Sequence, residues 1–305
     1  MGLRVATCQF PVSADIGRNL RYITRQLREA GNRGARVAHF PEASLSGYAG
    51  VDFASHNGFD WALLEDSARA VFALAGELGM WVVLGSAHRL TGDHKPRNSL
   101  YIVDDHGRLV DRYDKRFCAG SASADDGDLA HYSSGDHFTE FTIDGVRCGA
   151  LICHDYRYPE LYREYKRLGV DLVFHSFHAG GLGAERFAAM RAYVGEPLHG
   201  INLGTTLPGI TQPATMIAAA GANHVWISCP NSSAVRSCWP SFMVRADGVV
   251  TGRLRLHTAG VLVSEVDPAM ELYDSTEAWR DRVLAGTLHS GPLVRDSRSD
   301  DRVGL

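Results

Sequence analysis

A strand–helix–strand unit between residues 149 and 174 constrains the fold of this chain more than any other feature. Residues 149–152 form a short apolar run that suits a buried strand, and Pro159 is typical of the first residue of a helix. Gly169 ends that helix, and residues 170–174 are again apolar and strand-like. Two strands connected through a helix run parallel, so the sequence predicts an α/β fold.

Cys153 directly follows the first strand of this unit. In open α/β sheets, ligands bind outside the carboxyl ends of the strands, and a nearby helix N-terminus favours the thiolate form of a cysteine. A free cysteine is, however, more often a small buried hydrophobe, and this alone would explain Cys153. Cys148 lies five positions earlier and points to the opposite face of a strand. At most one of the two cysteines therefore faces the crevice.

The composition of the 305 residues is that of a soluble globular protein, with 45% hydrophobic and 22% charged residues. A net charge of -4 without a long basic run gives no reason to expect nucleic acid or an anionic membrane as partner. No charged N-terminal segment leads into an apolar signal core, and no apolar stretch approaches the roughly 20 residues that span a bilayer. We therefore expect a cytoplasmic protein without a membrane or nucleic-acid partner.

The cysteines and histidines do not indicate a metal site. The six cysteines are scattered and include no Cys-x-x-Cys pair, which fits neither a disulfide framework nor a zinc site. His175 and His178 have an i, i+3 spacing but lack an acidic ligand at fixed spacing. We therefore expect no metal ligands in this chain.

Two further chemical groups follow strand-like runs. Glu42 comes just after the apolar residues 35–40, and Lys115 comes directly after the second strand of a hairpin. Taken singly, Glu42 suits a helix start, Lys115 a hairpin edge and Cys153 the core. Together, a carboxylate, an ammonium and a thiol suit acyl transfer at a carbonyl or nitrile carbon. The carboxylate takes the thiol proton, the thiolate attacks, and the ammonium stabilises the developing negative charge.

The remaining pattern predicts one domain, residues 1–270, followed by a charged C-terminal arm, residues 271–305. Residues 119–135 are rich in Gly, Ser and Asp and predict a surface loop near the site, whereas residues 180–209 are glycine-rich and too weakly patterned to assign. Helices are predicted at residues 20–30, 64–78, 159–168 and 213–221. Further strands are predicted at residues 3–9, 35–40, 81–85, 98–103, 108–113, 138–143, 225–229, 242–245, 249–254 and 261–266.

Over most of its length the chain resembles the nitrilase, or carbon–nitrogen hydrolase, superfamily. The block Phe-Pro-Glu42 with Ser-Gly-Tyr48 resembles the glutamate motif of the family, Asp-Lys115 its lysine motif, and Cys153-His-Asp-Tyr-Arg-Tyr-Pro-Glu160 its cysteine motif. The order and the spacing, 73 residues from Glu42 to Lys115 and 38 more to Cys153, are also similar. A joint match of three motifs is a specific signal, whereas any one alone would be weak.

The resemblance implies a four-layer αββα sandwich that dimerises through its helical layers, with the arm at residues 271–305 reaching over the partner. We therefore expect a homodimer or a higher homo-oligomer. It implies Cys153 as nucleophile, Glu42 as general base, and Lys115 with the backbone N–H of His154 as the oxyanion site. The resulting thioester would be hydrolysed by water without a cofactor.

The resemblance also identifies residues around the predicted nucleophile. Tyr48, His154 and Tyr156 are expected to line the substrate pocket, and Arg157 is expected to form a structural ion pair.

Three departures from the family pattern affect the site. Many members carry a second glutamate shortly after the lysine, whereas here Asp125, Asp126 or Asp128 replaces it or the helper acid is absent. The segment that reads Arg-Ala-x-Glu-Asn in relatives reads Ala-Ala-Gly-Ala-Asn223 here. Residues 180–209 are expected to reshape the pocket.

An aspartate two places after the cysteine, with Arg157 and Pro159-Glu160 beyond it, resembles the amidase and carbamoyl-amide branches more than true nitrilases, whose motif has Trp-Glu after the cysteine. We therefore expect hydrolysis of a small linear amide. The first alternative is an N-carbamoyl amide hydrolase that releases carbon dioxide as well as ammonia. A nitrilase, an acyl transferase and a non-catalytic binding protein that kept the fold are further alternatives.

Overall fold

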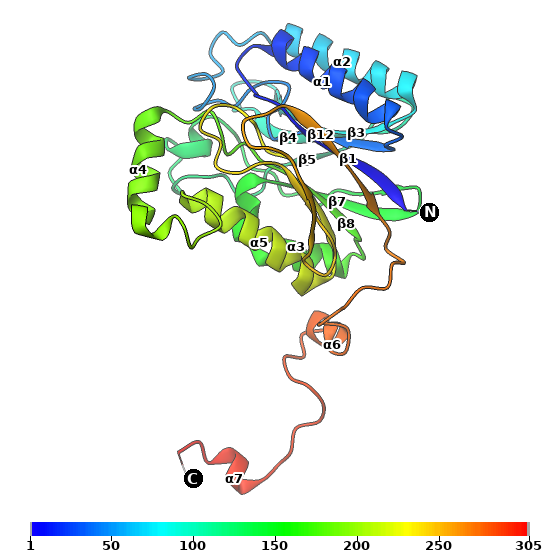
Figure 1. The fold of residues 1–305 in the computed structure, drawn as a ribbon, viewed down its shortest axis with the longest axis vertical. Helices are drawn as coiled ribbons and strands as arrows, with labels where there is room; N and C mark the ends of the chain where they lie inside the picture. Colours follow the sequence, from blue (N-terminus) through cyan, green and yellow to red (C-terminus); the bar gives the residue numbers. More distant parts are fainter. Residues whose placement is uncertain (1, 304–305) are drawn as a thin grey trace.

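The computed structural model describes residues 2–303 and contains two six-stranded sheets packed face to face, with helices on the outer side of each. Figure 1 shows the layers in order: α1 and α2, the first sheet, the second sheet, and then α3 with α5. The predicted four-layer αββα sandwich is therefore confirmed.

The first sheet has the strand order β12-β1-β2-β3-β4-β5. The three strands β1, β2 and β3 run parallel, and the other neighbours pair antiparallel. Its strands are β12 (Gly260–Val266), β1 (Leu3–Gln9), β2 (Val37–His39), β3 (Trp81–His88), β4 (Arg97–Val103) and β5 (Leu109–Asp114). Helices α1 (Ile16–Asn32) and α2 (Trp61–Leu78) cover its outer face.

The second sheet has the order β11-β10-β9-β8-β7-β6, and it contains the predicted strand–helix–strand unit. Strands β7, β8 and β9 run parallel, so the predicted βαβ arrangement is confirmed. Its strands are β11 (Val250–Arg253), β10 (Phe242–Val244), β9 (Trp226–Cys229), β8 (Leu172–Ser176), β7 (Val146–Ile152) and β6 (Glu140–Ile143). Helices α3 (Pro159–Arg167) and α5 (Leu207–Asn223) pack on its outer face.

The alternation of side chains along β1 explains why its sequence is apolar almost throughout. Leu3 and Val5 belong to the core that includes the second sheet, whereas Ala6 and Cys8 belong to the core under α1 and α2. Both faces of this strand are covered, as parallel strands in layered α/β folds require, and Arg4 is the only exposed residue among the seven of β1. The two apolar layers hold the strand ends in fixed positions.

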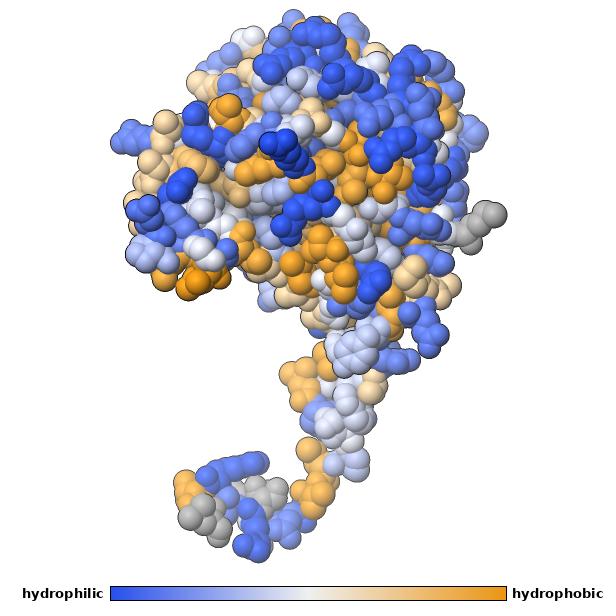
Figure 2. All heavy atoms as spheres, in the orientation of Figure 1, coloured by the Kyte–Doolittle hydropathy of each residue, from blue (hydrophilic) through white to orange (hydrophobic). Residues whose placement is uncertain are grey.

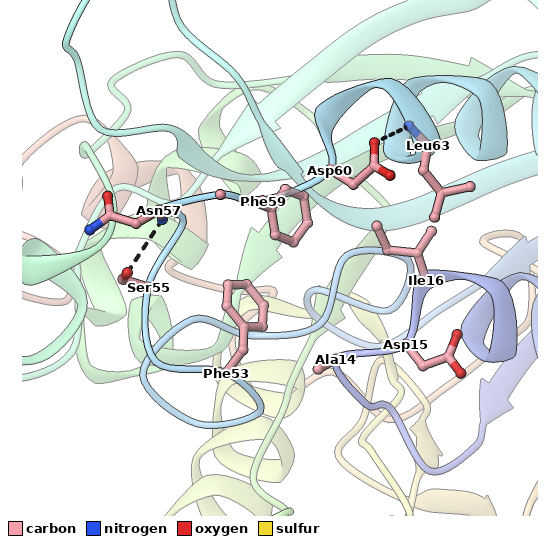
Figure 3. A pocket seen from close by; sticks show the side chains of 10 residues that line it. Ala14, Asp15, Ile16, Phe53, Ser55, Asn57, Phe59, Asp60 and Leu63 are labelled. Carbon is pink, nitrogen blue, oxygen red and sulfur yellow. Dashed lines mark hydrogen bonds between the residues drawn. The ribbon is translucent and has the colours of Figure 1, made fainter.

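Helices α1 and α2 begin side by side, and each has an aspartate at its N-cap. Asp15 accepts a hydrogen bond from Arg18 N at 2.8 Å, and Asp60 accepts one from Leu63 N at 2.9 Å. Figure 3 shows both carboxylates at the edge of a pocket of about 390 Å³ that Phe53 also lines. Because each aspartate bonds the helix that it begins, capping explains the acidic character of this pocket.

The structure differs from the sequence prediction mainly between residues 180 and 223. The weakly patterned segment contains α4 (Ala184–Val194) and the short 3₁₀ helix η3 (Glu196–Leu198). None of the residues of α4, all of them described, is buried, which is why no apolar period marks this helix. Helix α5 begins before the predicted start and contains Pro213.

The C-terminal arm leaves the body of the molecule after β12 and carries only the short helices α6 (Arg280–Leu284) and α7 (Ser297–Asp300). Figure 2 shows apolar side chains exposed along the arm. Leu288 and Leu293 are among the exposed apolar residues of this segment. Its packing on a partner stays a prediction, and residues 304–305 of the predicted arm lie outside the described residues. Within residues 2–303, no helix combines the length and apolar character needed to cross a membrane.

Candidate active site

The three predicted catalytic groups converge at one end of the sandwich. Glu42 follows β2, Lys115 follows β5 and Cys153 follows β7. The Lys115 Nζ lies 2.8 Å from the Glu42 Oε1, and each of these side chains is only 1% exposed. Cys153 is partly exposed and, with Glu42, lines a cavity of about 630 Å³. The ends of strands from both sheets thus bring together a carboxylate, an ammonium and a thiol.

The backbone around Glu42 is held tightly. The Glu42 N–H donates to the carbonyl of Phe177 at 3.2 Å, and the Asn98 side-chain amide donates to the Glu42 Oε1 at 2.8 Å. Gly85 permits this turn, because a Cβ at that position would lie 2.2 Å from the carbonyl oxygen of Pro41. The Glu42 Oε2 accepts no hydrogen bond that meets standard geometry from any residue between 2 and 303. One carboxylate oxygen is therefore bound to Lys115 and Asn98, while the other is left for a proton.

Asp128 supplies a second carboxylate beside the lysine. Its Oδ2 lies 2.7 Å from the Lys115 Nζ and accepts the Ala119 N–H at 2.7 Å, while its Oδ1 accepts a short hydrogen bond from the Tyr48 hydroxyl. It lies in the short 3₁₀ helix η1 (Gly127–Ala130), inside the predicted surface loop. Asp125 and Asp126 are exposed. Among the three aspartates considered, Asp128 therefore contacts the lysine.

The charges in this cluster stabilise one another. Burial alone would lower the pKa of Lys115, but the carboxylates of Asp128 and Glu42 raise it well above its usual range. Burial alone would raise the pKa of Asp128, but Lys115 and the Tyr48 hydroxyl lower it. Lys115 is thus an ammonium held between two carboxylates, and the three groups together carry one negative charge.

The Cys153 thiol is protonated in this environment. Burial and then the negative charge of Glu42 raise its pKa well above the usual range, and Lys115 opposes this only in part. The thiolate expected beside a helix N-terminus is not the resting form here, because burial and the Glu42 carboxylate raise the pKa of the thiol. Cys148 is fully buried away from the cavity, which confirms that only one of the two cysteines faces the crevice.

Asp155 joins the turn formed by residues 153–157, called the cysteine turn below, to the segment that follows β5 and contains Lys115. Its carboxylate accepts hydrogen bonds from the N–H of Ile152 at 3.0 Å, the N–H of Phe117 at 2.8 Å and the hydroxyl of Tyr113 at 2.8 Å. Burial raises its pKa to about 6. From the sequence, Asp155 served only to distinguish branches of the family. In the structure it holds the short 3₁₀ helix η2 (Cys153–Arg157) against the segment after β5.

The three predicted substrate-binding residues, Tyr48, His154 and Tyr156, all line the cavity. The Tyr48 hydroxyl donates to Asp128 and lies 3.2 Å from the Lys115 Nζ, so this side chain also supports the lysine. The Tyr156 hydroxyl lies 3.0 Å from the Thr211 hydroxyl on α5. His154 is partly exposed, and burial lowers its pKa.

Arg157 differs from its expected role. Within the described part of the chain it forms no ion pair, and its guanidinium lies 4.7 Å from the centroid of the Tyr156 ring. It is exposed and lines the cavity, where a guanidinium can stack on an aromatic face and still meet solvent. Residues 180–209 also reach this cavity, through Leu182, Arg186 and Met190, so the prediction that this segment shapes the pocket is confirmed.

The histidines of the i, i+3 pair have separate partners. The His178 Nε2 lies 3.0 Å from the Asp52 Oδ2, and the same oxygen accepts the Tyr48 N–H at 2.9 Å. Burial alone would lower the pKa of His178, but Asp52 raises it. The His175 Nε2 instead lies 3.2 Å from the carbonyl oxygen of Cys153. Sequence spacing could not show that these side chains support Tyr48 and the cysteine turn.

The fold and the buried carboxylate–ammonium–thiol cluster define the class of protein. The model of the carbon–nitrogen hydrolase family matches residues 4–273, and the chain belongs to this family.

The match to individual sequence relatives covers less of the chain than the match to the family model does. A hydrolase of Mycobacterium tuberculosis is 28% identical over 181 residues, which cover 56% of this chain and 59% of that protein. An omega-amidase of Bos taurus is 27% identical over 179 residues, which cover 56% of this chain and 62% of that protein. The chain thus matches less than two thirds of the length of these relatives. The structure of an amidase from Nesterenkonia sp. superposes with a TM-score of 0.70 at 19% identity, covering 94% of this chain and 97% of that one.

Proposed function

We propose that this protein is a cysteine-dependent hydrolase that cleaves the carbon–nitrogen bond of a small linear amide through a thioester. One observation carries the proposal: Cys153 shares a cavity with Glu42, whose Oε2 has no hydrogen-bond partner of standard geometry among the described residues, while Lys115 binds the other oxygen. The cavity of about 630 Å³ has room for a small substrate.

The first half of the reaction forms the thioester. Glu42 takes the thiol proton as the Cys153 sulfur bonds to the amide carbonyl carbon, and the carbonyl π electrons move to oxygen. Lys115 and the backbone N–H of His154 stabilise this oxyanion. When the carbon–nitrogen bond breaks, the proton held by Glu42 passes to the leaving nitrogen, so a primary amide releases ammonia.

The second half consumes one water molecule. Glu42 accepts a proton from the water molecule as the water oxygen bonds to the thioester carbon. The Cys153 sulfur then leaves and recovers this proton from Glu42. The products are a carboxylic acid and the free enzyme, and no cofactor takes part. Asp128 keeps Lys115 charged and in place through both halves.

Known relatives support this substrate class. Structures of the amidase from Nesterenkonia sp. AN1 contain butyramide, acrylamide, or the acetamide moiety of fluoroacetamide covalently added at the active-site cysteine. The sequence relatives include a 2-oxoglutaramate amidase of Bacillus subtilis and the omega-amidase of Bos taurus. The compounds bound in these structures and the names of these relatives point to amides, which favours an amide over a nitrile here.

A second candidate, an N-carbamoyl amide hydrolase, is favoured by Arg157. This guanidinium lies over the Tyr156 ring, lines the cavity and has no carboxylate partner in the described chain, so it can bind a carboxylate carried elsewhere on an N-carbamoyl substrate. Such a substrate would yield carbon dioxide in addition to ammonia.

Ammonia and carbon dioxide release over a panel of linear amides, N-carbamoyl compounds and nitriles tests these proposals. Ammonia without carbon dioxide from an amide supports the amidase, ammonia from a nitrile but not from the matching amide supports a nitrilase, and both gases from a carbamoyl compound support the second candidate. If the wild type converts none of the panel but binds an amide as tightly as Cys153→Ala does, the protein is a binding protein. The resemblance to the carbon–nitrogen hydrolase family also leads us to propose a homodimer. Sedimentation of the full chain tests this.

A further inference from the structure

His175 connects the interior of the second sheet to the turn that carries Cys153. It lies on β8 opposite Leu151 of β7, and it is fully buried. Its Nε2 lies 3.2 Å from the carbonyl oxygen of Cys153, and its Nδ1 lies 2.8 Å from the Tyr162 hydroxyl on α3. Its ring stacks on Phe177 at 4.4 Å between centroids. Contacts on three sides therefore fix this imidazole.

The partners of His175 determine its tautomer. A carbonyl oxygen can only accept, so the Nε2 carries the hydrogen and the Nδ1 is an acceptor. The Tyr162 hydroxyl also lies 3.4 Å from the Met216 sulfur, but a thioether is a weak acceptor, so this hydroxyl donates to the Nδ1 at 2.8 Å. Burial lowers the pKa of His175 to about 3, so the ring stays neutral at working pH. Tyr162 thus selects the form of His175 that donates to Cys153.

The carbonyl that His175 holds shares a peptide unit with the proposed oxyanion donor. In a planar trans peptide the C=O and the next N–H point in opposite directions. Holding the Cys153 carbonyl oxygen inside the core therefore aims the His154 N–H away from the core. Cys153 has a φ of 40°, a backbone conformation that non-glycine residues adopt only when their surroundings hold them. His175 is one of the groups that hold this turn.

We infer that His175, oriented by Tyr162, is a positioning residue that aims the His154 N–H at the substrate oxyanion. The inference rests on the proposed function, in which that N–H and Lys115 share the oxyanion. His175 itself is fully buried and is not among the residues that line the cavity, so it acts through the cysteine turn.

Two reactions of Cys153 separate positioning from general damage. With p-nitrophenyl acetate the sulfur bonds to the carbonyl carbon, the thiol proton goes to Glu42, an oxyanion forms, and p-nitrophenolate then leaves with its electron pair. With iodoacetamide the sulfur bonds to a saturated carbon and iodide leaves, so no oxyanion forms. Both require loss of the thiol proton. The ratio of the two rates at Cys153, followed by peptide mass spectrometry, therefore reports on the oxyanion site.

We expect His175→Phe, which keeps an aromatic ring but removes the donor, to lower this ratio roughly tenfold to a hundredfold, since loss of an oxyanion donor costs about that much or more. His175→Gln retains an N–H donor and should recover part of the loss. Tyr162→Phe, which frees the tautomer, should give a smaller fall. Should His175→Phe not fold, Tyr162→Phe carries the test, because it removes a single hydroxyl.

His39→Gln is the matched control. His39 is equally buried and is bound on both ring nitrogens by Ser228 and Ser176, but it does not contact Cys153. It should lower thermal stability while leaving the ratio unchanged. Equal loss of both rates in His175→Phe and Tyr162→Phe would overturn the inference. A wild type that is acylated but hydrolyses no amide would contradict the proposed function alone, and a wild type that is never acylated would overturn both.

Discussion

The proposed catalytic cluster (Glu42, Lys115 and Cys153, with Asp128) and the rim formed by residues 180–209 meet at the same cavity but are built in opposite ways. Glu42 and Lys115 are each 1% exposed and hydrogen-bonded to neighbours from other strands. The rim helix α4 has no buried residue, and Tyr193 and Ile201 of the rim are 77% and 80% exposed. The cluster is therefore set by the core, whereas the rim can change with little effect on stability.

This difference separates the chemistry from the choice of substrate. Substitutions in the cluster should affect the chemical step, folding, or both, because each group is held by several others. Substitutions in the rim should affect substrate affinity alone.

The largest effect should come from Cys153→Ala. Without the sulfur no thioester forms, so we expect turnover of the best panel amide to fall by roughly 10⁴-fold or more. Ammonia release measures the loss, and circular dichroism should show an unchanged fold. Cys118→Ala, which removes a partly buried thiol outside the cavity lining, is the matched control and should retain activity. Comparable turnover in the two variants would contradict the assignment of the nucleophile.

The buried carboxylate of Asp155 in the cysteine turn should lower the free energy of unfolding at neutral pH relative to that at pH 4. Burial raises the pKa of Asp155 from an ordinary 3.8 to about 6, so the folded protein binds this proton more tightly than the unfolded chain. Its contribution is fully present below about pH 4 and is lost as the pH rises through about 6, a difference of ~3 kcal/mol. Asp155→Asn removes this titration.

Urea unfolding of the wild type and of Asp155→Asn between pH 4 and pH 7 measures the effect. The free energy of unfolding of the variant should rise relative to that of the wild type across this interval. Asp125→Asn, at an exposed loop position, should follow the wild type. A constant difference between Asp155→Asn and wild type would show that Asp155 ionises normally.

A smaller effect is expected from Asp128→Asn. It leaves Glu42 as the only carboxylate bound to Lys115, so Glu42 binds the ammonium more tightly and takes the thiol proton less readily. We expect kcat to fall roughly tenfold to a hundredfold, with a smaller change in KM. Asp125→Asn serves again as the control in steady-state kinetics. Unchanged kcat in Asp128→Asn would remove Asp128 from the catalytic cluster.

The two regions also differ in how far the sequence predicted them. The strands and α2 were predicted closely, because burial on both faces produces apolar runs and Gly79 ends the helix in a left-handed conformation with φ of 60°. The positions of Glu42 and Cys153 after strands followed from the same runs. Helix α4 was missed because it packs on no core and therefore has no apolar period.

Other features of the site depend on contacts between distant segments. Asp128 could not be distinguished from Asp125 and Asp126, because the fold of the loop decides which of them reaches Lys115. The raised pKa of Cys153 depends on burial and then on Glu42, more than one hundred residues earlier in the chain. Arg157 was expected to have an acidic partner, but no described carboxylate reaches it.

The smallest effect should come from the rim. Arg186 on α4 lines the cavity, is exposed, and has no ion-pair partner among residues 2–303. We expect Arg186→Ala to change KM by severalfold, most for a linear amide with a terminal carboxylate. The kcat should stay unchanged, and the free energy of unfolding should stay within about 0.5 kcal/mol of that of the wild type. Arg191→Ala, on the same helix but outside the cavity lining, is the control. If Arg186→Ala lowered kcat as much as Asp128→Asn does, the rim and the cluster would be one functional unit, and the separation of chemistry from substrate choice would be wrong.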